Sequence, residues 1–431
     1  MAFALLIVYI TILLVRPQEW FEPLRAFELV NVAAILTIFM TFITRLRNQA
    51  LSDVLHRNTY ARLVWGLLFA VALSRLARGQ LQGAVDAVAE FGKSCILLFL
   101  TILLVDNPRR LLKVYWVIVI VAAMFCIHGY MQVQTGRGFG GTTPFGSFAS
   151  GDFRIMGTGL FSDPNDFAML HIVAFAFALA LLQTATWGPA KLFVMIVIPG
   201  MWYVLYYTQS RGGVVGLCAM LLAYVWTSTR ITIIRLFVAS ALLCAVVAFG
   251  PARARETVYE GSAGGRVMQW GYGNEFLKEN PLFGIGYQQW LERSEHVAHN
   301  SFITCYAELG LFGYALWFSL LWLVLRSVLR ISQLSALDRR TRCLATGLFA
   351  ALVGYYASAF FLTRTYNPFL YLLLGLAIGM IRYVQSLPNC PPGGFNIKRR
   401  DLMWSVLISV GCIPAIWILI RLYWLTGGTT D

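Results

Sequence analysis

The sequence predicts an all-α polytopic membrane protein with 12 or 13 transmembrane helices. Hydrophobic residues make up 58% of the 431 positions and charged residues only 13%, against about 25% charged in soluble proteins. The mean hydropathy is +0.68. Apolar runs long enough to cross a bilayer recur along most of the chain, and no segment has the composition of a soluble domain.

The expected spans are runs of roughly 20 apolar residues, or fewer where a helix is short. They are residues 2–15, 29–43, 61–77, 92–105, 114–134, 165–183, 191–208, 212–227, 232–250, 300–325, 342–362, 367–385 and 402–425. The first run has no basic n-region and no small-residue cleavage site, so we expect an uncleaved span rather than a signal peptide. Since the first two runs are short, 12 spans and 13 spans both stay open.

Lysine and arginine fall in alternate connections between the spans, which sets a predicted orientation. Basic residues mark the cytoplasmic side of a membrane protein; examples here are Arg109, Arg110, Lys113, Arg339, Arg340 and Arg342. The N-terminus is then inside, and the two longest connections, 135–164 and 251–299, lie outside. The net charge of +14 is scattered over span ends, which is typical of contact with anionic membrane lipids and argues against nucleic acid.

We expect residues 1–431 to form a single integral membrane domain that presents two long external loops on one face. Residues 135–164 are rich in glycine, and residues 251–299 form the loop expected to carry the chemistry. So apolar a chain has little reason to keep two long polar loops on one face unless that face binds or converts something. A flexible external loop is the alternative for most of 135–164.

No cofactor and no metal are expected. The eight cysteines are isolated, and the sequence has no CxxC pattern and no Cys/His ligand spacing. Asp163 and Asp166 are the closest external acidic pair, and their place at the start of a span is explained by helix capping. We therefore expect arginines to neutralise charge where many phosphate-handling sites use magnesium.

Three external arginines are candidates for binding an anion. Arg211 lies in SRGG at the external end of a span, where it is either an interfacial anchor or a ligand-binding residue. Arg266 follows two glycines in the polar loop, and Arg154 lies in the glycine-rich loop. Because guanidinium groups match phosphate oxygens in a planar fork, the three together predict a diphosphate clamp.

His299 is the candidate base. It heads the helix that re-enters the membrane, and histidine is the side chain best suited to remove a proton near neutral pH. Asn300 beside it is expected to orient a hydroxyl group, and Tyr287 and Asp163 are further substrate-binding candidates. Glu308, about 13 Å along the same helix at 1.5 Å per residue, is expected to pair internally. The alternative for His299 is a structural residue at the interface.

These motifs resemble the O-antigen ligase family, within a larger superfamily of ligases and polymerases. The resemblance rests on HN-x9-G-x2-G at His299, Asn300, Gly310 and Gly313, on SRGG at 210–213, on NPLFGIG at 280–286 and on GLFSDPNDFA at 159–168. It covers roughly residues 150–385, and its most specific part is the HNS segment. RPQEWF at 16–21 resembles the exosortase-associated branch of O-glycosylation ligases.

The resemblance implies a GT-C-like glycosyltransferase in the bacterial inner membrane with its active site facing the periplasm. Such enzymes transfer a glycan from undecaprenyl diphosphate to an acceptor sugar, usually on the lipid A core, without a metal and with inversion. In that scheme Arg211 and Arg266 bind the diphosphate and His299 is the base. A lateral groove for the carrier lipid is expected below the polar loop, lined by Trp270, Tyr272 and Trp290.

Three alternatives remain. A polymerase of the same superfamily needs the same clamp and base, so the motifs do not separate it from a ligase. A protein O-glycan ligase is suggested by the resemblance at 16–21. A transporter or flippase of lipid-linked sugars belongs to another class, but it would place charges near the bilayer midplane and often shows inverted repeats, whereas the unusual charges here cluster on one face.

Overall fold

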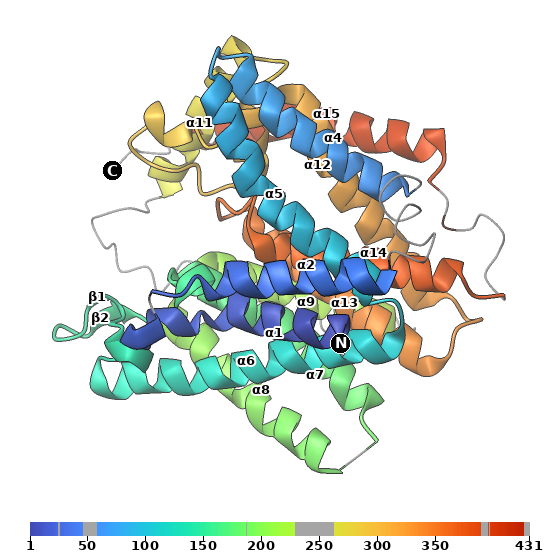
Figure 1. The fold of residues 1–431 in the computed structure, drawn as a ribbon. Coiled ribbons are helices and arrows are strands. Elements are labelled where there is room, and N and C mark those ends of the chain that lie inside the picture. The colour runs from blue at the N-terminus through green and yellow to red at the C-terminus, as the bar shows by residue number, and fades with distance from the viewer. Residues whose placement is uncertain are drawn as a thin grey trace.

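The computed structural model is a bundle of long helices with one small two-stranded sheet (Figure 1). It describes residues 1–24, 26–45, 58–186, 188–228, 263–388, 395 and 397–425. The predicted span 232–250 and the first part of the polar loop, 251–262, lie outside the described residues.

Ten helices in the described part of the chain are long and apolar enough to cross a membrane. They are α1 (Ala2–Val15), α4 (Thr59–Leu76), α5 (Leu81–Leu104), α6 (Pro108–Thr135), α7 (Pro164–Thr184), α8 (Gly188–Thr208), α9 (Arg211–Ser228), α12 (Ser301–Gln333), α14 (Pro368–Gln385) and α15 (Arg399–Leu425). The all-α polytopic prediction is confirmed. Two further predicted spans form helices outside these ten, the shorter apolar α2 (Leu29–Arg45) and α13 (Arg339–Ala359).

Helices α7, α13 and α14 form the centre of the bundle, because their side chains are buried on nearly every face. Small residues let them pack closely: a Cβ at Gly347 would come within 2.7 Å of Ala180, and one at Gly354 within 2.7 Å of Ile172. Helices α8 and α15 instead expose large apolar side chains, as expected for helices that face lipid.

The predicted spans 61–77 and 92–105 leave residues 78–91 as a connection between them. This predicted connection is too long, because α5 begins at Leu81. The first turns of α5 are amphipathic: Ala84, Ala87 and Phe91 are buried, whereas the polar residues between them are exposed. A hydropathy window detects only the uniformly apolar second half of such a helix. The connection to α4 is therefore a short turn.

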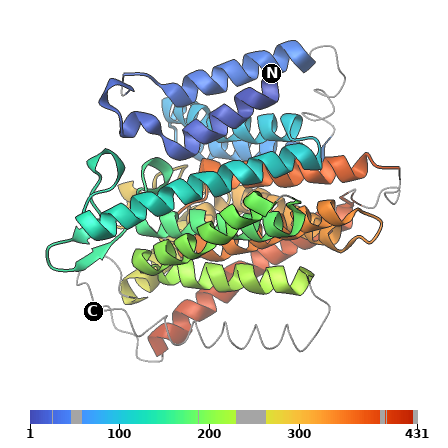
Figure 2. The same cartoon turned by 90° about the horizontal axis from the view of Figure 1, so that it is seen from below.

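The described parts of the two predicted external loops are folded and lie at the same end of the bundle (Figures 1 and 2). The glycine-rich segment contains the antiparallel hairpin β1 (Phe145–Ser147) and β2 (Asp152–Arg154). It also contains the 3-10 turns η4 (Phe139–Gly141) and η5 (Gly159–Phe161), and two more, η1 (Pro17–Glu19) and η2 (Glu22–Leu24), follow α1. The segment predicted as a polar loop contains α11 (Ala263–Glu279) and η6 (Trp290–Glu292).

Candidate functional site

The start of α12 is interlocked with the segment that precedes it. The helix breaks at Gly310, whose φ of 65° and ψ of −171° are not helical. Backbone hydrogen bonds run across the break from Ile285 N to Ala307 O (2.8 Å), Gly286 N to Glu308 O (3.0 Å), Leu311 N to Pro281 O (2.8 Å) and Phe312 N to Leu282 O (3.2 Å). The NPLFGIG and HN-x9-G-x2-G motifs are therefore two parts of one structural unit.

Two glycines allow this approach of backbone to backbone. Gly284 and Gly310 have φ of 71° and 65°, a region that favours glycine. A Cβ at Gly284 would overlap the backbone of Glu308, and a Cβ at Gly310 would overlap that of Leu282. Residues 301–309 are thereby held as a short helix of their own, and His299 lies just before its N-terminus.

His299 occupies a backbone position that few non-glycine residues adopt, with φ of 48°. On one side, Asn300 caps α12 by accepting hydrogen bonds from two backbone N–H groups of the first turn, at 2.9 and 3.2 Å. On the other side, the Ala298 carbonyl accepts a 3.0 Å hydrogen bond from Trp270 Nε1 on α11. The half-buried imidazole is thus carried by a backbone that is fixed at both neighbours.

Asn165, in the first turn of α7, joins the two arginine-bearing segments on the other side of the site. Its Oδ1 accepts hydrogen bonds from Arg154 Nη2 (3.0 Å) and from Ser210 Oγ (2.7 Å). Arg154 Nε also donates to the Thr208 carbonyl at 2.9 Å. Ser210 Oγ accepts from Gly213 N at 3.0 Å and so caps α9 directly before Arg211.

The structure brings Arg154, Arg211 and Arg266 close enough for their charges to interact, with Asp163 as an acidic neighbour. Burial lowers the pKa of Arg154 and of Arg266; the neighbouring guanidinium charges lower both further, and Asp163 raises both. The Nε atom of Arg266 is buried and has no hydrogen-bond partner among the described residues. Three guanidinium groups beside one carboxylate favour binding of a multiply charged anion.

His299 faces the same group of charges. Burial lowers the pKa of His299 to about 4; the positive charges of Arg266, Arg364 and His296 also lower it, and Asp163 raises it. Its imidazole is therefore neutral at pH 7 and able to accept a proton. In the part of the chain that the structure describes, no group of three or more His, Cys, Asp or Glu side chains could hold a metal ion.

A family model matches the part of the chain that contains Arg211, Arg266 and His299. Residues 196–318 match the model described as O-Antigen ligase. This match supports membership of the O-antigen ligase family. The matched region contains Arg211, Arg266 and His299, whereas Arg154 and Asp163 precede it. No curated protein matches the chain.

An ion pair that the sequence analysis missed lies beside the O-antigen ligase motifs. Asp166 is not part of a helix cap: its two carboxylate oxygens accept hydrogen bonds from Nε (2.5 Å) and Nη2 of Arg364. The explanation of Asp166 by capping alone is therefore wrong, whereas Asp163 does cap α7 through Asn165 N at 2.7 Å. The available signal was an arginine between two predicted spans, at 363–366, together with an acidic residue in another apolar span.

The glycines of the family's SRGG segment serve helix packing. A Cβ at Gly212 would come within 2.9 Å of Phe361, and one at Gly213 within 2.9 Å of Ala168. Their lack of a side chain lets α9 approach its neighbours closely. Arg211 itself is exposed at the first position of α9.

Two predicted substrate-binding residues have other surroundings. Asn300 is fully buried, and its side-chain oxygen is used in the cap; its Nδ2 has no partner among the described residues. Tyr287 is 2% exposed and belongs to the core, with its ring 4.4 Å from that of Tyr366. Glu308 pairs internally, as expected, by accepting a 3.3 Å hydrogen bond from Trp290 N.

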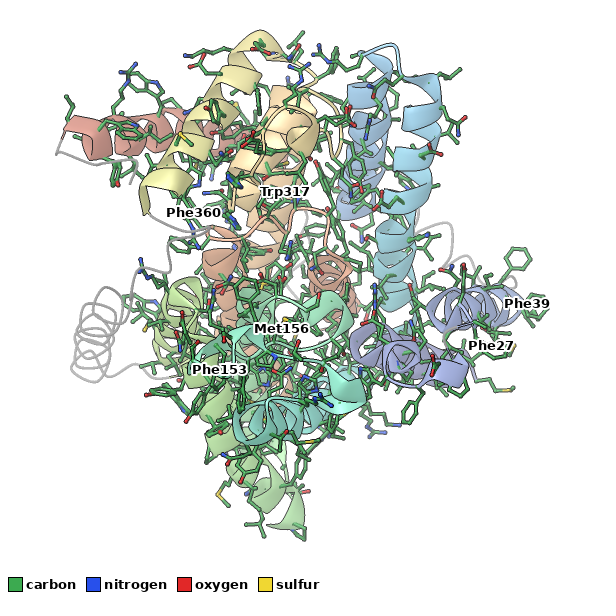
Figure 3. The ribbon with its side chains drawn as sticks, turned by 90° about the vertical axis from the view of Figure 1, so that its left-hand side faces the viewer. Phe27, Phe39, Phe153, Met156, Trp317 and Phe360 are labelled. Carbon is green, nitrogen blue, oxygen red and sulfur yellow. The ribbon has the colours of Figure 1, made fainter. Side chains whose placement is uncertain are left out.

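An open apolar groove of about 490 Å³ lies between α9, α12 and α13. Its walls are Val215, Phe302, Leu325, Val353, Tyr356, Ala357, Phe360 and Phe361. Phe361 packs against Gly212, next to Arg211. Phe360 packs edge to face on Trp270 of α11, with ring centroids 5.5 Å apart, and Figure 3 shows Phe360 beside α11. Among the residues expected to line a groove, Trp290 is only 3% exposed and belongs to the core.

Proposed function

We propose that this protein is an inverting glycosyltransferase that transfers a glycan from undecaprenyl diphosphate to an acceptor sugar of the lipid A core. The active site faces the periplasm at the bacterial inner membrane. The observation that carries the proposal is the convergence of three arginines with a neutral histidine at one end of a membrane bundle. The O-antigen ligase match supports the reaction class.

In the reaction, His299 takes the proton of an acceptor hydroxyl, and the oxygen attacks the anomeric carbon of the donor. The bond from that carbon to the diphosphate oxygen breaks, and its electron pair leaves with undecaprenyl diphosphate. Arg154, Arg211 and Arg266 stabilise the charge that develops on the diphosphate, which is the task metal ions perform in many phosphate sites. Substrate placement supplies the rest of the acceleration.

The apolar groove accounts for the lipid part of the donor. It begins beside Gly212 and Trp270, next to the arginines and the histidine loop, and continues among apolar side chains of three helices. A diphosphate held by the arginines would leave its polyprenyl chain at the mouth of this groove. The carrier could then enter sideways from the bilayer.

The test is a transfer assay with purified protein in detergent, an undecaprenyl-diphosphate glycan, a lipid A core acceptor and a chelator. Replacing the base typically costs 10²–10⁴-fold in rate, and replacing one charge-stabilising donor about 10²–10³-fold. We therefore expect His299→Ala and Arg211→Ala to lose transfer. Arg137→Ala is the matched control, because Arg137 is an exposed arginine at the same end of the bundle, after α6, and we expect it to retain activity.

Three other outcomes would redirect the proposal. Growth of the glycan on its carrier, without transfer to the lipid A core, would identify a polymerase. Transfer only to a protein acceptor would identify a protein O-glycan ligase. Movement of the lipid-linked glycan across proteoliposomes without any new glycosidic bond would identify a transporter.

A further inference from the structure

The Arg364–Asp166 ion pair occupies the junction between the two halves of the site. Asp166 is 2% exposed, and the side chain of Arg364 is 31% exposed. Arg364 donates to both carboxylate oxygens in the fork geometry that makes such pairs specific. Its third nitrogen, Nη1, donates to the Thr363 carbonyl at 2.8 Å. Burial opposes the charge on Arg364, but the hydrogen bonds and the charge of Asp166 outweigh burial and raise the pKa of Arg364 above its usual value.

On one side, the pair lies next to Asn165, which anchors the two segments that carry Arg154 and Arg211. Asp166 follows directly on Asn165, which accepts hydrogen bonds from Arg154 and Ser210. A displacement of the first turn of α7 would therefore move the anchors of both β2 and the start of α9. Arg154 and Arg211 are attached to those two elements.

On the other side, the stretch of chain that carries Arg364 holds the start of α12, two residues after the proposed base. Arg364 N donates to Ser301 Oγ at 2.8 Å, and Ser301 Oγ donates to the Leu362 carbonyl at 2.6 Å. Thr365 Oγ1 donates to the Ser301 carbonyl at 2.8 Å. Three hydrogen bonds thus hold Ser301 against residues 362–365. His299 lies two residues before Ser301 and is positioned by the same backbone.

We propose that the Arg364–Asp166 pair is a positioning device that fixes His299 relative to the arginine cluster. This inference rests on the proposed glycosyl transfer, in which a base on α12 must meet an anomeric carbon placed by arginines on other elements. Arg364 is a positioning residue and not a further clamp arginine, because its charge is already balanced by a buried carboxylate. A misplacement of about 1 Å between reacting groups can cost about a hundredfold in rate.

Two variants of the pair can separate a loss of positioning from a change in the electrostatic environment of His299, because they change the charge near His299 differently. The charges that face His299 are Arg266 from α11, Asp163 from the turn before α7, Arg364 from the connection after α13, and His296 from its own loop. Arg364→Gln removes a positive charge near His299, so the pKa of His299 should rise. Asp166→Asn removes the balancing carboxylate and leaves Arg364 charged, so that pKa should stay or fall. Both variants break the same pair.

The experiment measures two quantities on the full-length protein in detergent for Arg364→Gln, Asp166→Asn and Arg364→Lys. The first is the rate of carbethoxylation of His299 against pH, located by mass spectrometry, which needs no substrate. The second is kcat and KM for glycan transfer. Arg326→Gln is the matched control, since Arg326 pairs with Asp401 across α12 and α15 at 2.5 Å with a similar exposure, 33%.

We expect all three site variants to lose about tenfold to a hundredfold in kcat, with KM for the donor within about threefold of wild type. The carbethoxylation midpoint of His299 should rise by about half a pH unit or more only in Arg364→Gln. Arg326→Gln should lower thermal stability but change neither kcat for transfer nor the carbethoxylation midpoint of His299. Unchanged kcat in folded Arg364→Gln and Arg364→Lys would overturn the inference, and so would a raised donor KM at unchanged kcat. If wild type transfers no glycan, the proposed function fails. An unshifted carbethoxylation midpoint of His299 in Arg364→Gln would show that Arg364 does not face His299, and would overturn the inference without reference to transfer.

Discussion

Gly310 lies directly against the backbone of Leu282, and through this contact residues 281–286 complete a broken turn of α12. The break separates a short helix, residues 301–309, from the long apolar part of α12. The proposed base, His299, directly precedes the cap of this short helix, and Glu308 lies near its end. The HN-x9-G-x2-G motif thus contains both the proposed base, His299, and the glycine, Gly310, that allows the helix break.

Substituting Gly310 is expected to prevent correct folding of this unit. In Gly310→Ala the new Cβ overlaps the Leu282 backbone, and a non-glycine residue at φ 65° costs about 1–3 kcal/mol in addition. We expect a large fall in the thermal unfolding temperature and in transfer activity. Gly271→Ala is the control, because Gly271 lies inside α11 with no atom within 4 Å of its Cβ position. It should be neutral or stabilise by roughly 0.5–1 kcal/mol; equal losses in both variants would contradict the interlock.

The helices were largely predictable, because each span is defined by local hydropathy. All twelve predicted spans that fall within the described residues form helices, and errors are confined to ends such as the start of α5. The external segments were not predictable in the same way. The hairpin β1–β2, α11 and the break at Gly310 depend on contacts between residues far apart in sequence. Hydropathy carries no information about such contacts.

The residue types of the candidate site could be predicted from the sequence, but the contacts that join them could not. Arg154, Arg211 and Arg266 were singled out because none of them has a directly adjacent acidic residue in the sequence. Arg364 was missed because its partner, Asp166, is 198 positions away and looked like part of a helix cap. Asn165 was missed for a similar reason, since an amide in a capping motif gives no sign that it joins two other segments.

Asn165 is expected to control how well the arginine cluster binds the donor. In Asn165→Ala, Arg154 and Ser210 both lose an acceptor, and a hydrogen bond to a charged group contributes about 1.5–3 kcal/mol. We therefore expect kcat/KM for the donor to fall about tenfold to a hundredfold. Asn367→Ala, which removes the cap of α14, should cost only about 1 kcal/mol of stability and leave kcat/KM near wild type. A similar loss in both variants would mean that Asn165 acts only as a structural residue.

The pH dependence of transfer should follow His299. Burial, reinforced by Arg266, lowers the pKa of His299 to about 4, so kcat/KM should be constant near neutral pH and fall only as His299 becomes protonated, with a midpoint near that value. A bound diphosphate adds negative charge close to the imidazole and favours its protonated form. The acid limb of kcat, which reports the donor complex, should therefore lie at higher pH than the limb of kcat/KM. Coincident limbs would argue against a base that lies beside the diphosphate.

The apolar groove should determine how donors with different lipid lengths are used. Ala357 lines the groove, and Ala357→Trp would fill part of it and displace the carrier chain. Since each buried CH₂ group contributes about 0.8 kcal/mol, we expect KM for an undecaprenyl donor to rise about tenfold or more, whereas KM for a short-chain prenyl donor should change little. Ile196→Trp places the same side chain on the outer surface of α8, where Ile196 is 65% exposed, and should leave both KM values unchanged. If Ala357→Trp affects long and short donors equally, the lipid chain does not lie in this groove, and the substitution acts through the packing of α13 against α9 instead.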